Sequence, residues 1–259
     1  MKARGFFLGA LMIVAGASEV LASSLDDGIA AAKRGDYSTA LSDFLPLANQ
    51  GDALAQYNIG ILYKDGGHGV PQDYEEARKW LTKAAEGGGD RTAVVSNASF
   101  LLGIMLESGL GGPKDPTGAR KWYLAAAERG NIKAADYVAQ YFEQGLGGPT
   151  DLVAARKWLL EAAQQGNADA QYHIGRYFFL GIAGPKDEDI GLDWMRKAAA
   201  QGQVQAQYTL GLHYQNLGNY DEATKWFSKA AEQGYAPAKE ALQQPPNSKS
   251  VGACGICLE

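Results

Sequence analysis

The side chains in this sequence best suited to bind a metal ion or transfer a proton at neutral pH are three histidines. His68 lies in a glycine-rich stretch, whereas His173 and His213 lie in separate segments of helical pattern. No HExxH motif, no histidine pair at ligand spacing and no carboxylate cluster accompanies them. We therefore expect loop or helix-surface histidines, with no metal, no cofactor and no catalytic residue.

Two cysteines, Cys254 and Cys257, form a CxxC pair near the C-terminal end of the sequence. No histidine follows Cys257, so the haem-attachment motif is absent, and two thiolates supply only half of a structural zinc site. The polar, proline-containing composition of residues 243–259 predicts a flexible tail. Three interpretations of the pair stay open: a local disulfide, a tether to a partner's cysteine, and a redox or metal site.

Hydrolase and phosphate-binding motifs are also missing from the sequence. No GxSxG pattern marks a nucleophilic serine, and no glycine-rich loop follows a strand and ends in Gly-Lys-Ser/Thr. The glycine-rich stretches, such as residues 65–73 and 108–116, are therefore interpreted as connectors. We predict that the protein is not an enzyme.

The elements that would position any functional side chain are set by a repeat. Ala154, Trp158 and Ala162 share one face of a predicted helix, Gly166 ends it, and Ala170 and Ile174 start a second face of the same kind. The same spacing of eight residues from tryptophan to glycine recurs along the chain, which predicts stacked helical hairpins with the tryptophans in the core. The tryptophans are Trp80, Trp122, Trp158, Trp194 and Trp226.

Small residues recur inside the first helix of the hairpins. Glycine in a helix interior loses about 1 kcal/mol of helix propensity, so a packing role is the better explanation. We expect these positions to let the Ala-Ala pairs of the second helices approach closely. Aspartates before the second helices are placed to cap them. The small residues are Gly60, Ala139, Gly175 and Gly211, and the aspartates are Asp73, Asp115, Asp151 and Asp187.

The N-terminal residues 1–22 have the pattern of a secretory signal peptide. Lys2 and Arg4 precede an apolar run, and small residues offer cleavage after Ala17 or after Ala22. The run is shorter than the roughly 20 residues of a membrane-spanning helix, so we expect no stable membrane insertion after cleavage. The predicted localisation is periplasmic or secreted. A net charge of −5 disfavours nucleic acid as a partner.

The repeat resembles the Sel1-like repeat, a longer-looped relative of the tetratricopeptide repeat. The resemblance implies an all-α, right-handed α/α superhelical solenoid of about six hairpins over residues 23–242. It also implies that the first helices line a concave face that binds other proteins. Six additional residues before Ala98 predict a longer helix or a bulging loop in the third repeat. The repeats are approximately 25–51, 52–88, 89–130, 131–166, 167–202 and 203–234.

A concave groove on the first helices is the predicted binding site for another protein. Asp136 replaces an aromatic residue in this row, and we interpret it either as a solvated residue or, with Arg176, as a charged contact in the groove. The predicted function is a non-catalytic scaffold or regulator in the bacterial cell envelope, bound to an envelope or signalling component. The alternatives are an envelope enzyme acting on cell-wall material or a β-lactam, and a redox or metal module built on the CxxC pair. The groove residues are Tyr57, Ile61, Phe100, Ile104, Asp136, Gln140, Tyr172, Arg176, Tyr208 and Leu212.

Overall fold

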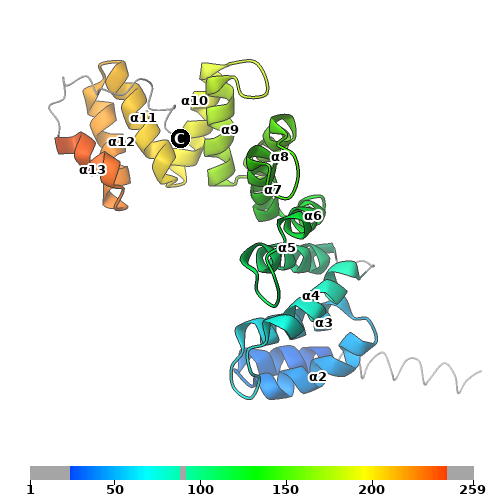
Figure 1. Cartoon of the computed structure of the whole chain (residues 1–259). Coiled ribbons are helices and arrows are strands. Elements are labelled where there is room, and N and C mark those ends of the chain that lie inside the picture. Colours follow the sequence, from blue (N-terminus) through cyan, green and yellow to red (C-terminus); the bar gives the residue numbers. More distant parts are fainter. Residues whose placement is uncertain (1–23, 88–91, 244–259) are drawn as a thin grey trace, which may run out of the picture. The chain divides into compact units, whose positions relative to one another are not determined.

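The structure is a computed structural model that describes residues 24–87 and 92–243. Helices account for the regular structure of these ranges (Figure 1), and an isolated β-bridge joins Gly67 and Val70 in a loop. This confirms the expected fold class, an all-α repeat solenoid fold built from helical hairpins. The described residues divide into two compact units, with the boundary between Asn131 and Ile132.

In the first unit, three helical hairpins follow one another. We call the first helix of each hairpin the A helix and the second the B helix. Residues 24–33 are helical and form the first A helix. Within this unit, α2 also packs against α3, and α4 packs against α5. The third A helix has 17 residues, whereas the second has 13. Of the two alternatives predicted for the third repeat, a longer helix or a bulging loop, the structure therefore has the longer helix. The labelled helices are α2 (Tyr37–Asn49), α3 (Ala53–Asp65), α4 (Tyr74–Glu86), α5 (Thr92–Ser108) and α6 (Pro116–Ala127).

The second unit continues the same alternation of A and B helices. It contains three hairpins, α7/α8, α9/α10 and α11/α12, and a final helix, α13, that packs against α12. The connection after α8 takes the conformation that the sequence predicts, since Gly166 has φ +93°. The helices are α7 (Ile132–Gln144), α8 (Leu152–Gln164), α9 (Ala168–Leu180), α10 (Glu188–Ala200), α11 (Val204–Asn216), α12 (Tyr220–Glu232) and α13 (Ala236–Gln243).

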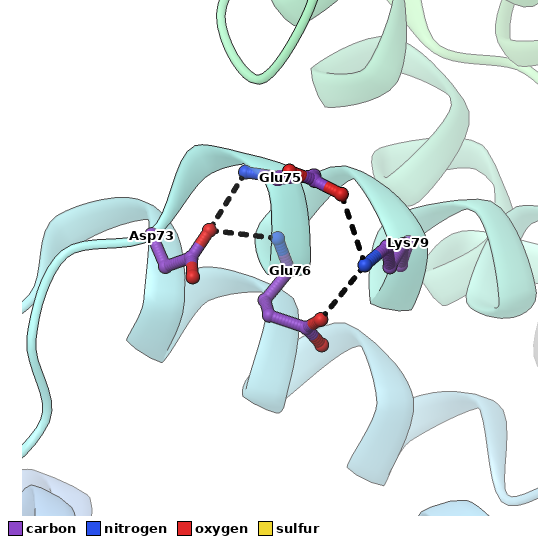
Figure 2. A network of polar contacts seen from close by, with 4 residues as sticks. All are labelled: Asp73, Glu75, Glu76 and Lys79. Carbon is purple, nitrogen blue, oxygen red and sulfur yellow. Dashed lines mark hydrogen bonds and ion pairs between the residues drawn. The ribbon is translucent and has the colours of Figure 1, made fainter.

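Aspartate caps fix the starts of the middle B helices. Asp73 accepts hydrogen bonds of 3.0 Å from the backbone N–H groups of Glu75 and Glu76, and Lys79 pairs with both glutamates one turn later (Figure 2). Such a cap satisfies backbone donors that have no partner within the helix. The predicted capping role is confirmed at all four positions, Asp73, Asp115, Asp151 and Asp187.

The tryptophans are not the centre of the core, contrary to the prediction. Trp80 is buried, but the other four, Trp122, Trp158, Trp194 and Trp226, are only partly buried. The indoles lie at the edge of the packed face, where a lysine lies over each ring. The Nζ atom is closest at Trp80, Trp194 and Trp226, at 3.9, 4.1 and 4.3 Å from the ring centroid. The residue after each tryptophan fills the core instead, at 0–3% exposure: Leu81, Tyr123, Leu159, Met195 and Phe227.

The small residues of the A helices receive these core side chains, which corrects the expected role in alanine-pair packing. A Cβ atom added to Gly60 would lie 2.7 Å from Leu81 Cγ. One added to Gly211 would lie 2.5 Å from the Phe227 ring. These separations are too short for a carbon contact, so glycine is what lets the B helix approach with a bulky residue. Gly28 and Phe44 have the same relation in the first hairpin, which identifies it as a true member of the repeat.

A glutamine on three A helices ties each hairpin to the preceding B helix, a feature that the sequence interpretation missed. Gln56 Nε2 donates to the carbonyl of Ala48 at 2.9 Å, and Gln171 and Gln207 donate to the carbonyls of Ala163 and Ala199 at 3.1 Å. These bonds satisfy carbonyls in the last turn of the B helix. The recurring Ala-Gln pair at residues 55–56, 170–171 and 206–207 was the available signal.

Substitution of Gly211 by alanine tests the close approach. Alanine gains up to about 1 kcal/mol of helix propensity, yet we expect a net loss of about 1–3 kcal/mol in the free energy of unfolding because the new methyl group displaces Phe227. Urea denaturation measures this change. The comparison is Ala139→Gly at the equivalent position of α7, where the loss of about 1 kcal/mol of helix propensity and of about 0.8 kcal/mol for the buried methyl group should both lower stability. A Gly211→Ala variant more stable than wild type would contradict the packing role.

Candidate functional site

The predicted groove residues lie at two equivalent positions of successive A helices, and we call this set the A-helix row. Four belong to the first unit, on α3 and α5, and six to the second unit, on α7, α9 and α11. Eight of the ten side chains are partly exposed, whereas Asp136 and Leu212 are 9% and 8% exposed. Leu212 belongs to the apolar cluster of the last hairpin. The row is therefore accessible in each unit, except at these two positions.

The part of the row in the first unit is apolar. Ile61 and Ile104 are partly exposed, and the Phe100 ring lies 5.8 Å from that of Tyr123, the core residue of the same hairpin. Burial raises the pKa of the Tyr57 hydroxyl, which keeps it neutral at physiological pH. These side chains offer aliphatic and aromatic contact area without charge.

The aromatic residues of the second unit also pack the hairpins together. The Tyr208 ring lies 5.6 Å from that of Phe227 and 5.3 Å from that of Tyr235, the residue that precedes α13. Tyr172 packs against the apolar cluster of α10 and α11. Both rings are only partly buried, so one side of each contributes to stability while the other is accessible.

Asp136 is buried, so its interpretation as a solvated residue is wrong. Its Oδ2 atom accepts a 3.0 Å hydrogen bond from Gln140 Nε2, one turn later on α7. Its Oδ1 atom is buried and has no hydrogen-bond partner among the described residues. Burial, with a smaller contribution from the Asp169 carboxylate, raises the pKa of Asp136 to about 6, against the opposing effect of the Gln140 hydrogen bond.

The face of α9 carries further polar groups with incomplete hydrogen bonding. Arg176 is partly exposed, and its buried Nε atom has no partner among the described residues. Burial and the Arg176 charge lower the pKa of the neighbouring His173, so its imidazole is neutral at pH 7. His173 is partly buried rather than at the helix surface. This partial burial could not be predicted from the helical pattern, because burial depends on the neighbouring helices.

Tyr177 was also missed by the sequence interpretation. Its ring is 2% exposed, and its hydroxyl is buried. Burial and the nearby Glu143 carboxylate raise the pKa of Tyr177. The A helices α7 and α9 thus bring together acidic, basic and neutral polar groups.

The described residues show no group of three or more histidine, cysteine or acidic side chains that could hold a metal ion. Nor does any helix in the described ranges have the length and apolar character needed to cross a membrane. The predicted signal peptide and the pair Cys254 and Cys257 lie outside the described residues. The histidines His68, His173 and His213 take part in no such group.

Substitution of Asp136 by asparagine tests the burial of this carboxyl group. Its pKa is about 6 in the folded protein and about 3.9 in an unfolded chain. The folded state therefore binds more protons between about pH 4 and 6, and stability falls as the pH rises through this window. The ionised form is disfavoured by about 3 kcal/mol above pH 6. We expect Asp136→Asn to raise the free energy of unfolding at pH 7.5, with little change at pH 4.

Urea denaturation at both pH values measures this difference. Asp189→Asn, at an exposed position of α10, is the matched control and should not show a stabilisation confined to high pH. Loss of stability in Asp136→Asn at pH 7.5 would mean that a cation already compensates the Asp136 carboxylate.

Comparison with known proteins places this geometry in a family. The model of the Sel1 repeat matches residues 53–89, 96–131, 132–167 and 168–203, and that of the tetratricopeptide repeat matches residues 204–233. A comparison with curated proteins gives no match.

Two solved structures are similar over most of the chain. A Sel1 repeat protein from Oxalobacter formigenes is 30% identical, with a TM-score of 0.72, over 85% of this chain and 86% of the other. The second is c5321, a protective antigen of uropathogenic Escherichia coli strains with an SLR fold. It is 30% identical, with a TM-score of 0.78, over 86% of this chain and 48% of its own, so the present chain spans about half of its length. Proteins with this repeat generally serve as non-enzymatic scaffolds for protein interactions. The chain belongs to the Sel1 repeat family.

Proposed function

We propose that this protein is a non-catalytic scaffold or regulator of the bacterial cell envelope that binds another protein along the A-helix row. The observation that carries the proposal is the partial exposure of the row at equivalent positions from α3 to α11. Side chains that only packed the hairpins would be buried, like the core residues of the B helices. Partly exposed aromatic and arginine side chains are the usual anchors of protein interfaces.

The two units present different chemistry to a partner. Tyr57, Ile61, Phe100 and Ile104 make the first unit's part of the row apolar, whereas Gln140 and Arg176 give the second unit's part a polar character. Arg176 can donate from its accessible guanidinium nitrogens to a partner carboxylate or carbonyl. The first unit's part of the row therefore suits an apolar partner segment, and the second unit's part suits an acidic or polar one.

Site-specific photocrosslinking tests the binding face. A photoreactive residue at Ile61, Ile104 or Arg176 is expected to give a crosslinked partner in intact cells, because these side chains are accessible on the A helices. The matched controls are Lys121 and Lys157, which are exposed on the B helices. Equal crosslinking at the B-helix positions, or none at the A-helix positions, would contradict the assignment of the binding face.

Export is part of the proposal, and it is supported by the basic residues, apolar run and small residues of the first 22 positions. The mass of the protein recovered from the periplasm or medium is expected to correspond to a chain that begins at Ser18 or at Ser23. A protein retained in the cytoplasm with its first 22 residues intact would contradict this localisation, without bearing on the binding face.

A further inference from the structure

A cavity of about 280 Å³ opens between the first two A helices of the first unit. Phe44 of α2 and Leu62 of α3 line it and are 1% and 6% exposed, so they form a fixed apolar floor. Ile29 and Ile61 also line it and are only partly buried. The cavity therefore has a buried apolar floor and apolar walls that are partly exposed to solvent.

The repeat explains why the walls face each other. Ile29 follows Gly28, and Ile61 follows Gly60, the two glycines that receive core side chains of the B helices. The isoleucines thus occupy the same repeat position in neighbouring A helices, and Ile61 belongs to the A-helix row. The cavity lies at the start of this row and is part of the same face.

Two polar side chains complete the lining. Lys33 is the charged residue of the cavity and is exposed, and Asn58 is partly buried. Neither makes a hydrogen bond or ion pair with another residue of the described ranges. A lysine at the edge of an apolar cavity favours a ligand that joins an apolar group to a negative charge, because the positive charge of Lys33 then complements that of the ligand.

The cavity is small and open, which suits a side chain of a peptide segment that lies across its mouth. Pockets that enclose small ligands have volumes of roughly 300–1,000 Å³, and this cavity is open and slightly smaller. We propose that it binds a peptide segment of the partner by a bulky aliphatic side chain next to an acidic residue. The aliphatic group covers Ile29 and Ile61, the carboxylate pairs with Lys33, and the Asn58 amide bonds to the peptide backbone. This inference rests on the proposed scaffold function and names the chemistry of its partner.

Titration of the purified protein with the peptide acetyl-GGLEGG-amide tests the proposal, monitored by NMR of the Asn58 side-chain amide and the isoleucine methyl groups. We expect saturable shifts of the Asn58, Ile29 and Ile61 signals. Binding should weaken at least fivefold when alanine replaces the peptide leucine or glutamine replaces the glutamate. A peptide that shifts none of these signals, or that binds equally well without its leucine, would overturn the proposal.

A charge reversal isolates the role of Lys33. The Lys33→Glu variant should prefer acetyl-GGLKGG-amide to acetyl-GGLEGG-amide by at least threefold, whereas Lys133→Glu, at an exposed position of α7, should keep the wild-type order. An unchanged preference in Lys33→Glu would overturn the recognition of an acidic residue. Shifts of the same signals that depend on protein concentration without peptide would mean that a second copy fills the cavity, and would also overturn it.

The crosslinking outcome distinguishes this proposal from the proposed function. Partner capture at Arg176 with no peptide binding at the cavity would leave the scaffold function intact and remove only the cavity. Peptide binding at the cavity without partner capture at any A-helix position would support the cavity as a peptide site and contradict the proposed scaffold function.

Discussion

The structure depends on the close approach of a bulky B-helix side chain to a glycine of the A helix. In five of the hairpins this pair is Gly28 with Phe44, Gly60 with Leu81, Gly103 with Tyr123, Gly175 with Met195 and Gly211 with Phe227. Without a Cβ atom on the A helix, the helix backbone forms part of the core surface, and the opposing side chain is fully enclosed. The cost in helix propensity, about 1 kcal/mol per glycine, is offset by the apolar area that each pair removes from water.

This contact also determines which side chains remain available for binding. The glycine position directs one side of each A helix to its own B helix, so the residue that follows the glycine lies at the edge of the packed face. Ile29, Ile61, Ile104 and Arg176 follow such a glycine and are partly exposed, whereas Leu212, which follows Gly211, is buried. The packed position and the exposed position are therefore adjacent on the same helix.

The aromatic residues of the A-helix row contribute both to the packing of the hairpins and to the accessible surface. Phe100 contacts Tyr123, and Tyr208 contacts both Phe227 and Tyr235, so these rings stabilise the hairpins as well as offering contact area. Truncation of an aromatic residue would weaken packing and binding together. Ile61 and Arg176 separate the two effects better, because each lies beside the packed position rather than in it.

The sequence by itself determined the repeat, the helical hairpins, the aspartate caps and the position of the A-helix row. These features depend on local spacing and on residue types such as glycine, proline and aspartate, whose backbone preferences act within one turn. Only the tertiary structure decided that the residue after each tryptophan fills the core, that Asp136 is buried, and that a cavity opens beside Lys33. The physical reason is that burial depends on which neighbouring helix covers a side chain. A helical period gives the face on which a residue lies but not how far the next helix extends over it.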